Sequence, residues 1–115
     1  MSLKITRTDY GDVTVLELEG RITLGEGATY FRNTVKETLQ MGRLKLVIVY
    51  AGVSFVDSAG NGEIVTAYTY TRNAGGMLVL AGIPKGIRDL MQITKLFTVF
   101  ETFETIPDAV AYLAN

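Results

Sequence analysis

The sequence predicts one α/β domain over residues 1–115, with an N-terminal β-hairpin joined to a mostly parallel central sheet and about four helices. Three observations predict this class. Strand-like and helix-like segments alternate after the first 20 residues, which favours parallel strands with right-handed crossovers. Segments 44–50 and 77–82 are almost continuously apolar, as strands buried on both faces are. A chain of 115 residues can also bury one core without disulfides.

Two alternating runs open the chain. Residues 3–8 and 13–19 place apolar side chains at alternate positions, and DYGD between them supplies the Asp and Gly of a hairpin turn. Gly20 is expected to end the second strand. The period then changes to that of a helix of about 14 residues, whose apolar face is Phe31, Val35 and Leu39.

The second half alternates helices and strands. Ser58–Asn73 reads as a helix between the two buried strands, with an inward stripe of Ile64, Val65, Tyr68 and Thr71 or Arg72. After strand 77–82, a short helix is expected with Ile87, Leu90, Met91 and Thr94 on one face. Residues 98–103 alternate like a strand near an edge, and a last helix carries Ile106, Ala109, Val110 and Leu113.

The composition excludes several functions. Eleven Lys and Arg against twelve Asp and Glu leave a net charge of −1, without the basic surplus of a nucleic-acid-binding protein. The chain has neither cysteine nor histidine, so thiolate chemistry and the commonest general base and metal ligand are absent. We therefore expect no metal, no cofactor and no enzymatic activity. No run approaches the roughly 20 apolar residues of a membrane span and no signal peptide opens the chain, which predicts a cytoplasmic protein without membrane insertion.

One segment stands apart. In VSFVDSAGNGEIV, residues 53–65, Asp57 and Ser58 join a strand to a helix, and either can cap the helix. Gly60 and Gly62 each cost a helix about 1 kcal/mol relative to alanine, which indicates a need for close approach. In a parallel sheet Ser58 would lie beyond the carboxyl end of a strand, where open α/β proteins meet ligands and partners.

A phosphate on Ser58 would lie near the partial positive charge of a helix N-terminus and add up to about two negative charges to a small, flat surface. This predicts a switch that abolishes docking. Catalysis by Ser58 is not expected, because no His, Cys or nearby Lys could activate it. The Gly-rich segment 25–30, GEGATY, lacks the spacing of a phosphate-binding loop and indicates a turn.

The stretch LVIVYAGVSFVDSAGNGEIVTAY, residues 46–68, resembles the signature of STAS domains, the module shared by sulphate transporters and anti-sigma factor antagonists. Residues 52–60 match the family's Gly-Val, aromatic, apolar, Asp-Ser and Gly step almost one for one. LEGRITLGEG, NAGGMLVLAG and IRDLMQITKLFTVFETFET resemble three further family segments in the same order. The resemblance covers nearly the whole chain and implies a STAS-type fold.

The resemblance also implies a bacterial anti-sigma factor antagonist that regulates transcription by partner switching. Such a protein, when unphosphorylated, binds an anti-sigma factor of the serine-kinase type and so releases the sigma factor. Phosphorylation reverses the binding, and a serine phosphatase resets it. On this chain the implied acceptor is Ser58, and the implied partner-binding residues are Asp57, Ser58, Ala59, Gly60, Asn61 and Thr23.

The chain departs from its relatives at three of these positions and at Val49. Many relatives have a second serine at Ala59 and an apolar residue at Asn61, and antagonists often have acidic residues at Thr23 and Val49. Two other functions therefore stay open: a STAS adaptor or structural subunit of a stress-sensing or transporter-associated complex, and a nucleotide- or anion-binding module. The apolar run ITKLFTVF also leaves a weak homodimer open.

Overall fold

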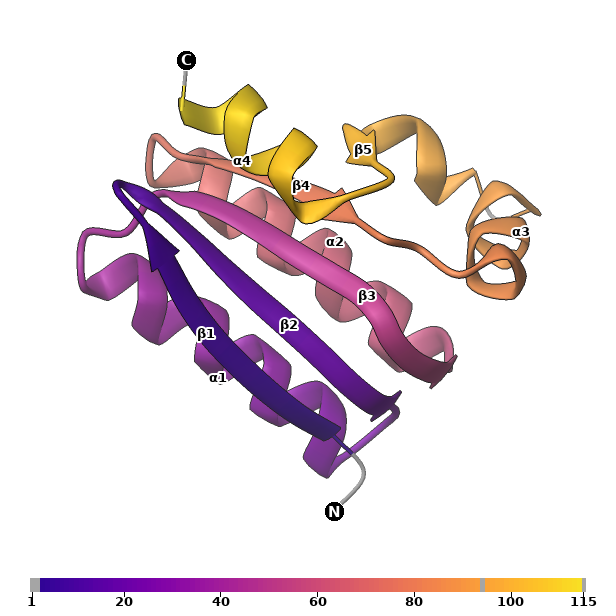
Figure 1. Ribbon diagram of the computed structural model, residues 1–115. Coiled ribbons are helices and arrows are strands. Elements are labelled where there is room, and N and C mark those ends of the chain that lie inside the picture. Colours follow the sequence, from indigo (N-terminus) through magenta and orange to yellow (C-terminus); the bar gives the residue numbers. More distant parts are fainter. Residues whose placement is uncertain (1–2, 94, 115) are drawn as a thin grey trace.

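The computed structural model describes residues 3–93 and 95–114, with the backbone alone at 96 and 97. A five-stranded sheet of order β1-β2-β3-β4-β5 separates two helical layers (Figure 1). Strands β1 and β2 are antiparallel and the other neighbours are parallel, which confirms the expected fold class. The elements are β1 (Leu3–Tyr10), β2 (Val13–Ile22), α1 (Glu26–Gln40), β3 (Lys45–Val56), α2 (Ser58–Asn73), β4 (Met77–Ala81), α3 (Lys85–Ile93), the 3₁₀-helix η1 (Leu96–Val99), β5 (Thr102–Phe103) and α4 (Ile106–Ala114).

The sheet is buried on both faces by two separate apolar clusters. In β3, Leu46 and Ile48 face the cluster under α1, α2 and α3, whereas Val47 and Val49 face the cluster under α4. Alternate residues of β2 and β4 divide in the same way. Because successive side chains in a strand point to opposite faces, a strand covered on both sides must be apolar throughout. This is the physical reason for the continuous apolar segments in the sequence.

Strands β2 and β3 run further than the sequence predicts. Gly20 does not end β2, which continues to Ile22 and pairs with β3 through Gly20↔Val53 and Ile22↔Val56. The register shifts within this pairing, and at Gly52 a Cβ atom would lie 2.9 Å from the Leu18 carbonyl oxygen. Glycine lets the two backbones approach there, so the residue that interrupts the apolar pattern is the one that permits pairing to continue.

The helices largely follow the predicted periodicity. Phe31 and Val35 of α1 are buried, and α2 occupies the predicted range. In α2 the inward face includes Ala67, and Arg72 is exposed. In α3 the prediction for Leu90 is wrong, because this side chain is 40% exposed while its neighbour Met91 is buried. Thr94 lies outside the described residues.

The predicted strand over 98–103 is wrong in its first half. Only Thr102–Phe103 pair with β4, while Leu96–Val99 form a 3₁₀-helix. The chain reverses at Lys95, whose φ of 61° lies in the left-handed region. Phe100 then turns inward and packs edge-to-face on Tyr68 with ring centroids 5.3 Å apart. The apolar alternation thus serves an inward aromatic contact and not a longer strand.

We expect Phe31→Ala to lower the free energy of unfolding by about 3–5 kcal/mol, because Phe31 is 0% exposed in the larger cluster and its removal leaves a cavity. Urea unfolding followed by circular dichroism measures the change. Tyr30→Ala is the matched control on the same turn of α1, since Tyr30 is 39% exposed and its truncation should cost much less. Equal losses for the two variants would contradict this assignment of the core.

Candidate functional site

The Ser58 step lies where β3 ends and α2 begins, at the carboxyl edge of the parallel strands. Ser58 is the first residue of α2 and is exposed. Asp57 precedes it in an extended conformation and caps the helix, because its Oδ1 accepts a 2.9 Å hydrogen bond from the Gly60 N–H. The local sequence therefore turns a buried strand into a helix and presents a hydroxyl to solvent at the turn.

The second oxygen of Asp57 holds a distant segment. Its Oδ2 accepts a 2.8 Å hydrogen bond from the Leu24 N–H, in the loop between β2 and α1. The Asp57 N–H in turn donates to the Ile22 carbonyl oxygen at 3.3 Å. Amide donors from Leu24, and secondarily from Gly60, stabilise the charged carboxylate and lower the pKa of Asp57 below its ordinary value. Asp57 is thus a clamp between two loops as well as a cap.

The two glycines of the first turn have different roles. A Cβ atom on Gly60 would collide with the Ile22 carbonyl oxygen and lie 2.8 Å from Val56 Cγ1. A Cβ atom on Gly62 would meet nothing within 4 Å. Gly60 is therefore required for α2 to start against β2, whereas packing does not explain why residue 62 is a glycine.

Two exposed apolar residues are joined to the Ser58 step, one by a hydrogen bond and one along the chain. Leu24 is 80% exposed, with its backbone held by Asp57, and Phe55, three residues before Ser58 in β3, is 45% exposed. The Arg21 guanidinium lies over the Phe55 ring at 4.8 Å. Sequence reasoning missed both residues, because Leu24 belongs to no periodic stripe and Phe55 reads as one position of a buried strand. The sequence signal that could have identified them is an apolar residue just before a polar or Gly-rich segment: Leu24 precedes the Gly-rich loop, and Phe55 precedes the Asp57-Ser58 turn.

The structure brings the predicted site residues together but buries some of them. Thr23 adjoins the clamped Leu24 and is half-buried, and its carbonyl oxygen accepts from the Ala28 N–H at 2.9 Å. Gly60 is buried beneath Ser58, and Asn61 is only 8% exposed, with an Oδ1 that has no hydrogen-bond partner among the described residues. A partner contact at these positions stays a prediction. Asp57 and Ala59 are half-buried, and Val49 lies in the cluster under α4.

The Ser58 step presents an exposed hydroxyl next to a carboxylate whose oxygens already accept hydrogen bonds. Within residues 3–93 and 95–114, no group of three or more acidic side chains gathers as a metal site would require. The amide donor of Gly60 is already taken by the Asp57 carboxylate, so the helix N-terminus holds its own anion. Nor does the described part of the chain contain a helix long and apolar enough to cross a membrane.

A family model described as the STAS domain matches residues 4–109. The chain belongs to the STAS domain family. Solved structures with this fold include an anti-sigma factor antagonist from Mycobacterium paratuberculosis, with 19% identity over 99% of this chain and 96% of that one, at a TM-score of 0.84. Another is the Bacillus cell fate determinant SpoIIAA in its phosphorylated form, with 16% identity over 96% and 98% of the chains, at a TM-score of 0.72. The STAS fold also matches within the murine Solute Carrier 26 family member A9 anion transporter, at 20% identity and a TM-score of 0.79, covering 94% of this chain and 19% of the transporter.

Alanine at the two glycines of this STAS domain should have opposite effects. Gly60→Ala should destabilise the protein by about 1–3 kcal/mol or more, because the added carbon meets backbone. Gly62→Ala should stabilise it by about 0.5–1 kcal/mol through helix propensity alone. Thermal and urea unfolding of both variants beside the parent measure the effects. Destabilisation of similar size by both would contradict the close approach of α2 to β2.

The Asp57 clamp predicts a specific acid transition. Because the pKa of Asp57 is lowered in the folded state, its stabilising contribution is present above the unfolded value near 3.9 and is lost as pH falls through the folded pKa. The amide resonances of Leu24 and Gly60 should shift together with a midpoint below about 3.9. In Asp57→Asn the shared transition should vanish, since an amide can still accept from Gly60 but does not titrate. Independent midpoints in the parent protein would contradict a shared clamp.

Proposed function

We propose that this STAS domain is an anti-sigma factor antagonist that works by partner switching through Ser58. In its unmodified form it binds an anti-sigma factor of the serine-kinase type, and phosphorylation of Ser58 by that kinase ends the complex. A serine phosphatase restores the binding form. The chain acts in this scheme by binding and not by catalysis, and it touches no nucleic acid itself.

The observation that carries the proposal is the exposure of Ser58 at the start of α2, with exposed Phe55 three residues before it in β3 and exposed Leu24 bonded through its backbone to Asp57. A kinase can reach such a hydroxyl, and a docking partner gains affinity by covering the apolar groups around it. Structures of SpoIIAA in its unphosphorylated and phosphorylated forms resemble this chain at TM-scores of 0.74 and 0.72. That pair supports the idea that this fold tolerates a phosphate without changing class.

Electrostatics explains why a phosphate at Ser58 would prevent docking. A phosphoserine carries about −1.5 to −2 charges at neutral pH. The neighbouring Asp57 carboxylate already accepts from the amides of Leu24 and Gly60, so an added phosphate has a like charge beside it and fewer free donors to receive it. It would therefore stay hydrated at the surface. A partner that covers Leu24 and Phe55 would have to bury part of that charge, which costs far more than one apolar contact returns.

The test uses the purified chain and candidate anti-sigma factors of the serine-kinase type, with binding measured by isothermal titration calorimetry. We expect Ser58→Ala to bind with nearly the parent affinity and Ser58→Asp to weaken binding at least tenfold. After incubation with kinase and ATP, intact mass and peptide mapping should place one phosphate on Ser58.

Thr105→Asp is the matched control, because Thr105 likewise carries a hydroxyl at the start of a helix, α4, on the other face of the sheet, where its Oγ1 accepts from the Asp108 N–H at 3.2 Å. It should leave binding unchanged. A phosphate on another residue, with Ser58 unmodified while the kinase is active, would refute the switch. A stable complex that ignores both Ser58 variants would instead favour the adaptor function.

A further inference from the structure

Strand β1 is an exposed edge of the sheet. It pairs with β2 alone, and Figure 1 shows no strand on its other side. Residues 6–10 of this strand are all exposed to solvent except Thr8, which is half-buried. An edge strand with accessible backbone groups is a ready template for pairing with another chain.

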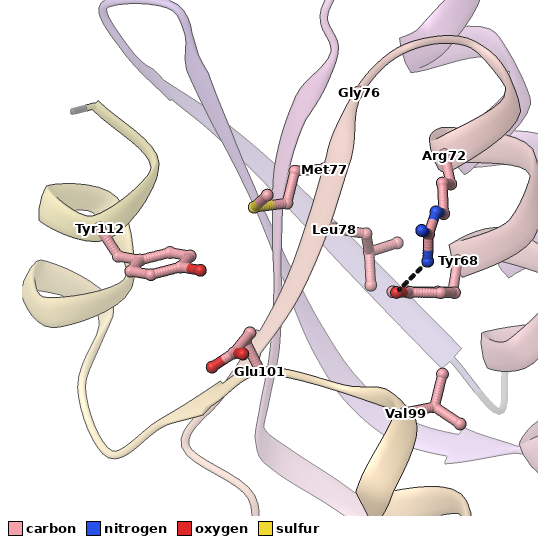
Figure 2. A pocket seen from close by; sticks show the side chains of 8 residues that line it. All are labelled: Tyr68, Arg72, Gly76, Met77, Leu78, Val99, Glu101 and Tyr112. Atoms are coloured by element: carbon pink, nitrogen blue, oxygen red, sulfur yellow. Dashed lines mark hydrogen bonds between the residues drawn. The ribbon is translucent and has the colours of Figure 1, made fainter.

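The opposite edge of the sheet is closed by side chains. Strand β5 pairs only with Leu80 and Ala81 of β4, and Leu78 in the other half of β4 is 2% exposed in the larger apolar cluster. Figure 2 shows side chains on both sides of this half of β4, with Arg72 of α2 on one side and Tyr112 of α4 on the other. The structure therefore leaves β1, and not β4, open to a further strand.

The hairpin turn fixes which backbone groups of β1 face the open edge. Tyr10 and Val13 flank a two-residue turn, whose first residue, Gly11, has a φ of 61°, as the first central residue of a type II′ turn requires. The residues that flank such a turn are bonded to each other, and bonded pairs alternate with non-bonded pairs along an antiparallel ladder. Even-numbered residues of β1 therefore bond to β2. Odd-numbered residues, among them Arg7 and Asp9, direct their N–H and C=O groups toward the open edge.

A contact on the other side of β2 agrees with this assignment. The Ile22 carbonyl oxygen accepts from the Asp57 N–H on the β3 side, so even-numbered residues of β2 turn toward β3 and odd-numbered ones, such as Val13, toward β1. Within the described part of the chain, no loop or side chain bonds to the backbone of Arg7 or Asp9. These groups are available to a second strand.

The sequence of this edge is complementary to itself in one antiparallel register. When two copies pair about a two-fold axis at Thr8, Arg7 of each copy lies opposite Asp9 of the other. Thr8 then lies opposite Thr8, and Thr6 opposite Tyr10. Opposite charges, threonine pairs and aromatic residues beside β-branched residues are all favourable directly across an antiparallel pair.

The charges select this register over its neighbours. An axis at Arg7 would place two arginines opposite each other, and an axis at Asp9 would do the same with two aspartates, which like-charge repulsion disfavours. No other axis at a residue of β1 brings opposite charges together. The charged residues that would discourage indiscriminate pairing of an edge strand thus permit one arrangement.

The Arg7 guanidinium has donors left for a second copy. Its Nε and Nη2 donate to Asp9 of the same chain at 3.1 and 2.8 Å, and its Nη1 donates to the Met41 Sδ at 3.4 Å. A guanidinium has five N–H groups, so two of them remain. Paired copies would join their two Arg7–Asp9 bridges into a ring of alternating charges on one face of the sheet.

We propose that this chain associates with a second copy of itself through β1, with residues 6–10 of the two copies paired antiparallel about a two-fold axis at Thr8. The paired segment is short beside the roughly 20–30 residues a side of a stable interface, so we expect a weak dimer with a Kd of about 0.1–1 mM. It lies at the amino end of β2, whereas Ser58 follows the carboxyl end of the parallel strand β3. The dimer therefore leaves both Ser58 surfaces open, and a partner with two binding sites gains affinity from it without a new contact.

Single cysteines test the register, because the chain has none of its own. Across the axis, Thr8 and its copy form a non-hydrogen-bonded pair with Cα atoms about 4.5 Å apart, which a disulfide can bridge. Thr6→Cys is the matched control on the same face of β1, since its two copies would lie about 14 Å apart along the strands, too far for a disulfide. In a glutathione redox buffer at about 1 mM protein, we expect Thr8→Cys to give a covalent dimer on non-reducing electrophoresis and Thr6→Cys to stay monomeric.

Charge reversal tests the pairing without a thiol. Arg7→Asp and Asp9→Arg each place like charges opposite each other in a homodimer and should raise its Kd at least about tenfold in sedimentation equilibrium. An equimolar mixture of these two variants places opposite charges across both positions and should associate as the parent does. Ser58→Asp should also associate as the parent does, which separates this contact from the proposed switch.

Three results would overturn the proposal. The first is a parent chain that stays monomeric at about 2 mM, which would mean that the edge charges only prevent pairing. The second is equal crosslinking of the two cysteine variants. The third is self-association of both charge variants at the parent Kd.

Discussion

The site depends on the two hydrogen bonds that the Asp57 carboxylate accepts. The carboxylate joins the start of α2 to a loop 33 residues earlier, through one hydrogen bond to Gly60 and one to Leu24. The bond to Leu24 requires that the first turn of α2 lie against the end of β2, and only a glycine at position 60 leaves room for that. The Asp57 carboxylate, the Leu24 N–H and the absence of a Cβ atom at Gly60 therefore act together. Loss of any of the three would release the surface around Ser58 from its present shape.

The hydrogen bonds of Asp57 also determine how a negative charge added at the start of α2 would act. Helix N-termini commonly receive anions, and a phosphate at the start of α2 could be expected to find donors there. Asp57 already fills that role from within the chain. Negative charge added nearby is thus directed to solvent and to any docking surface, not into the helix. This geometry gives little support to a nucleotide- or anion-binding site at the start of α2. It gives more support to a protein-binding surface there.

The two helical layers give the two ends of the sheet different properties. At the carboxyl end, β2 and β3 are paired out to Ile22 and Val56, so the Ser58 step stands on a rigid base. At the amino end of β4, strand β5 pairs only with Leu80 and Ala81, and Leu78 is buried by side-chain packing in the larger apolar cluster. The brevity of β5 follows from the reversal at Lys95 and the inward turn of Phe100. The carboxyl end of the sheet is thus held by long backbone pairing, and the amino end of β4 by side-chain packing.

The sequence alone determined the fold class, the order of the elements and the placement of Ser58 at the head of a helix. Periodicity and continuous apolar runs report burial, and burial on both faces requires the architecture observed. The sequence could not determine where the pairing of the strands stops. Gly20 and Gly52 look like breaks, yet their backbones pair, while the alternating residues before Thr102 do not form a strand. Only the tertiary structure decided these points, together with the partner of Asp57 and the exposure of Leu24, because each depends on a segment far away in the chain that local pattern does not record.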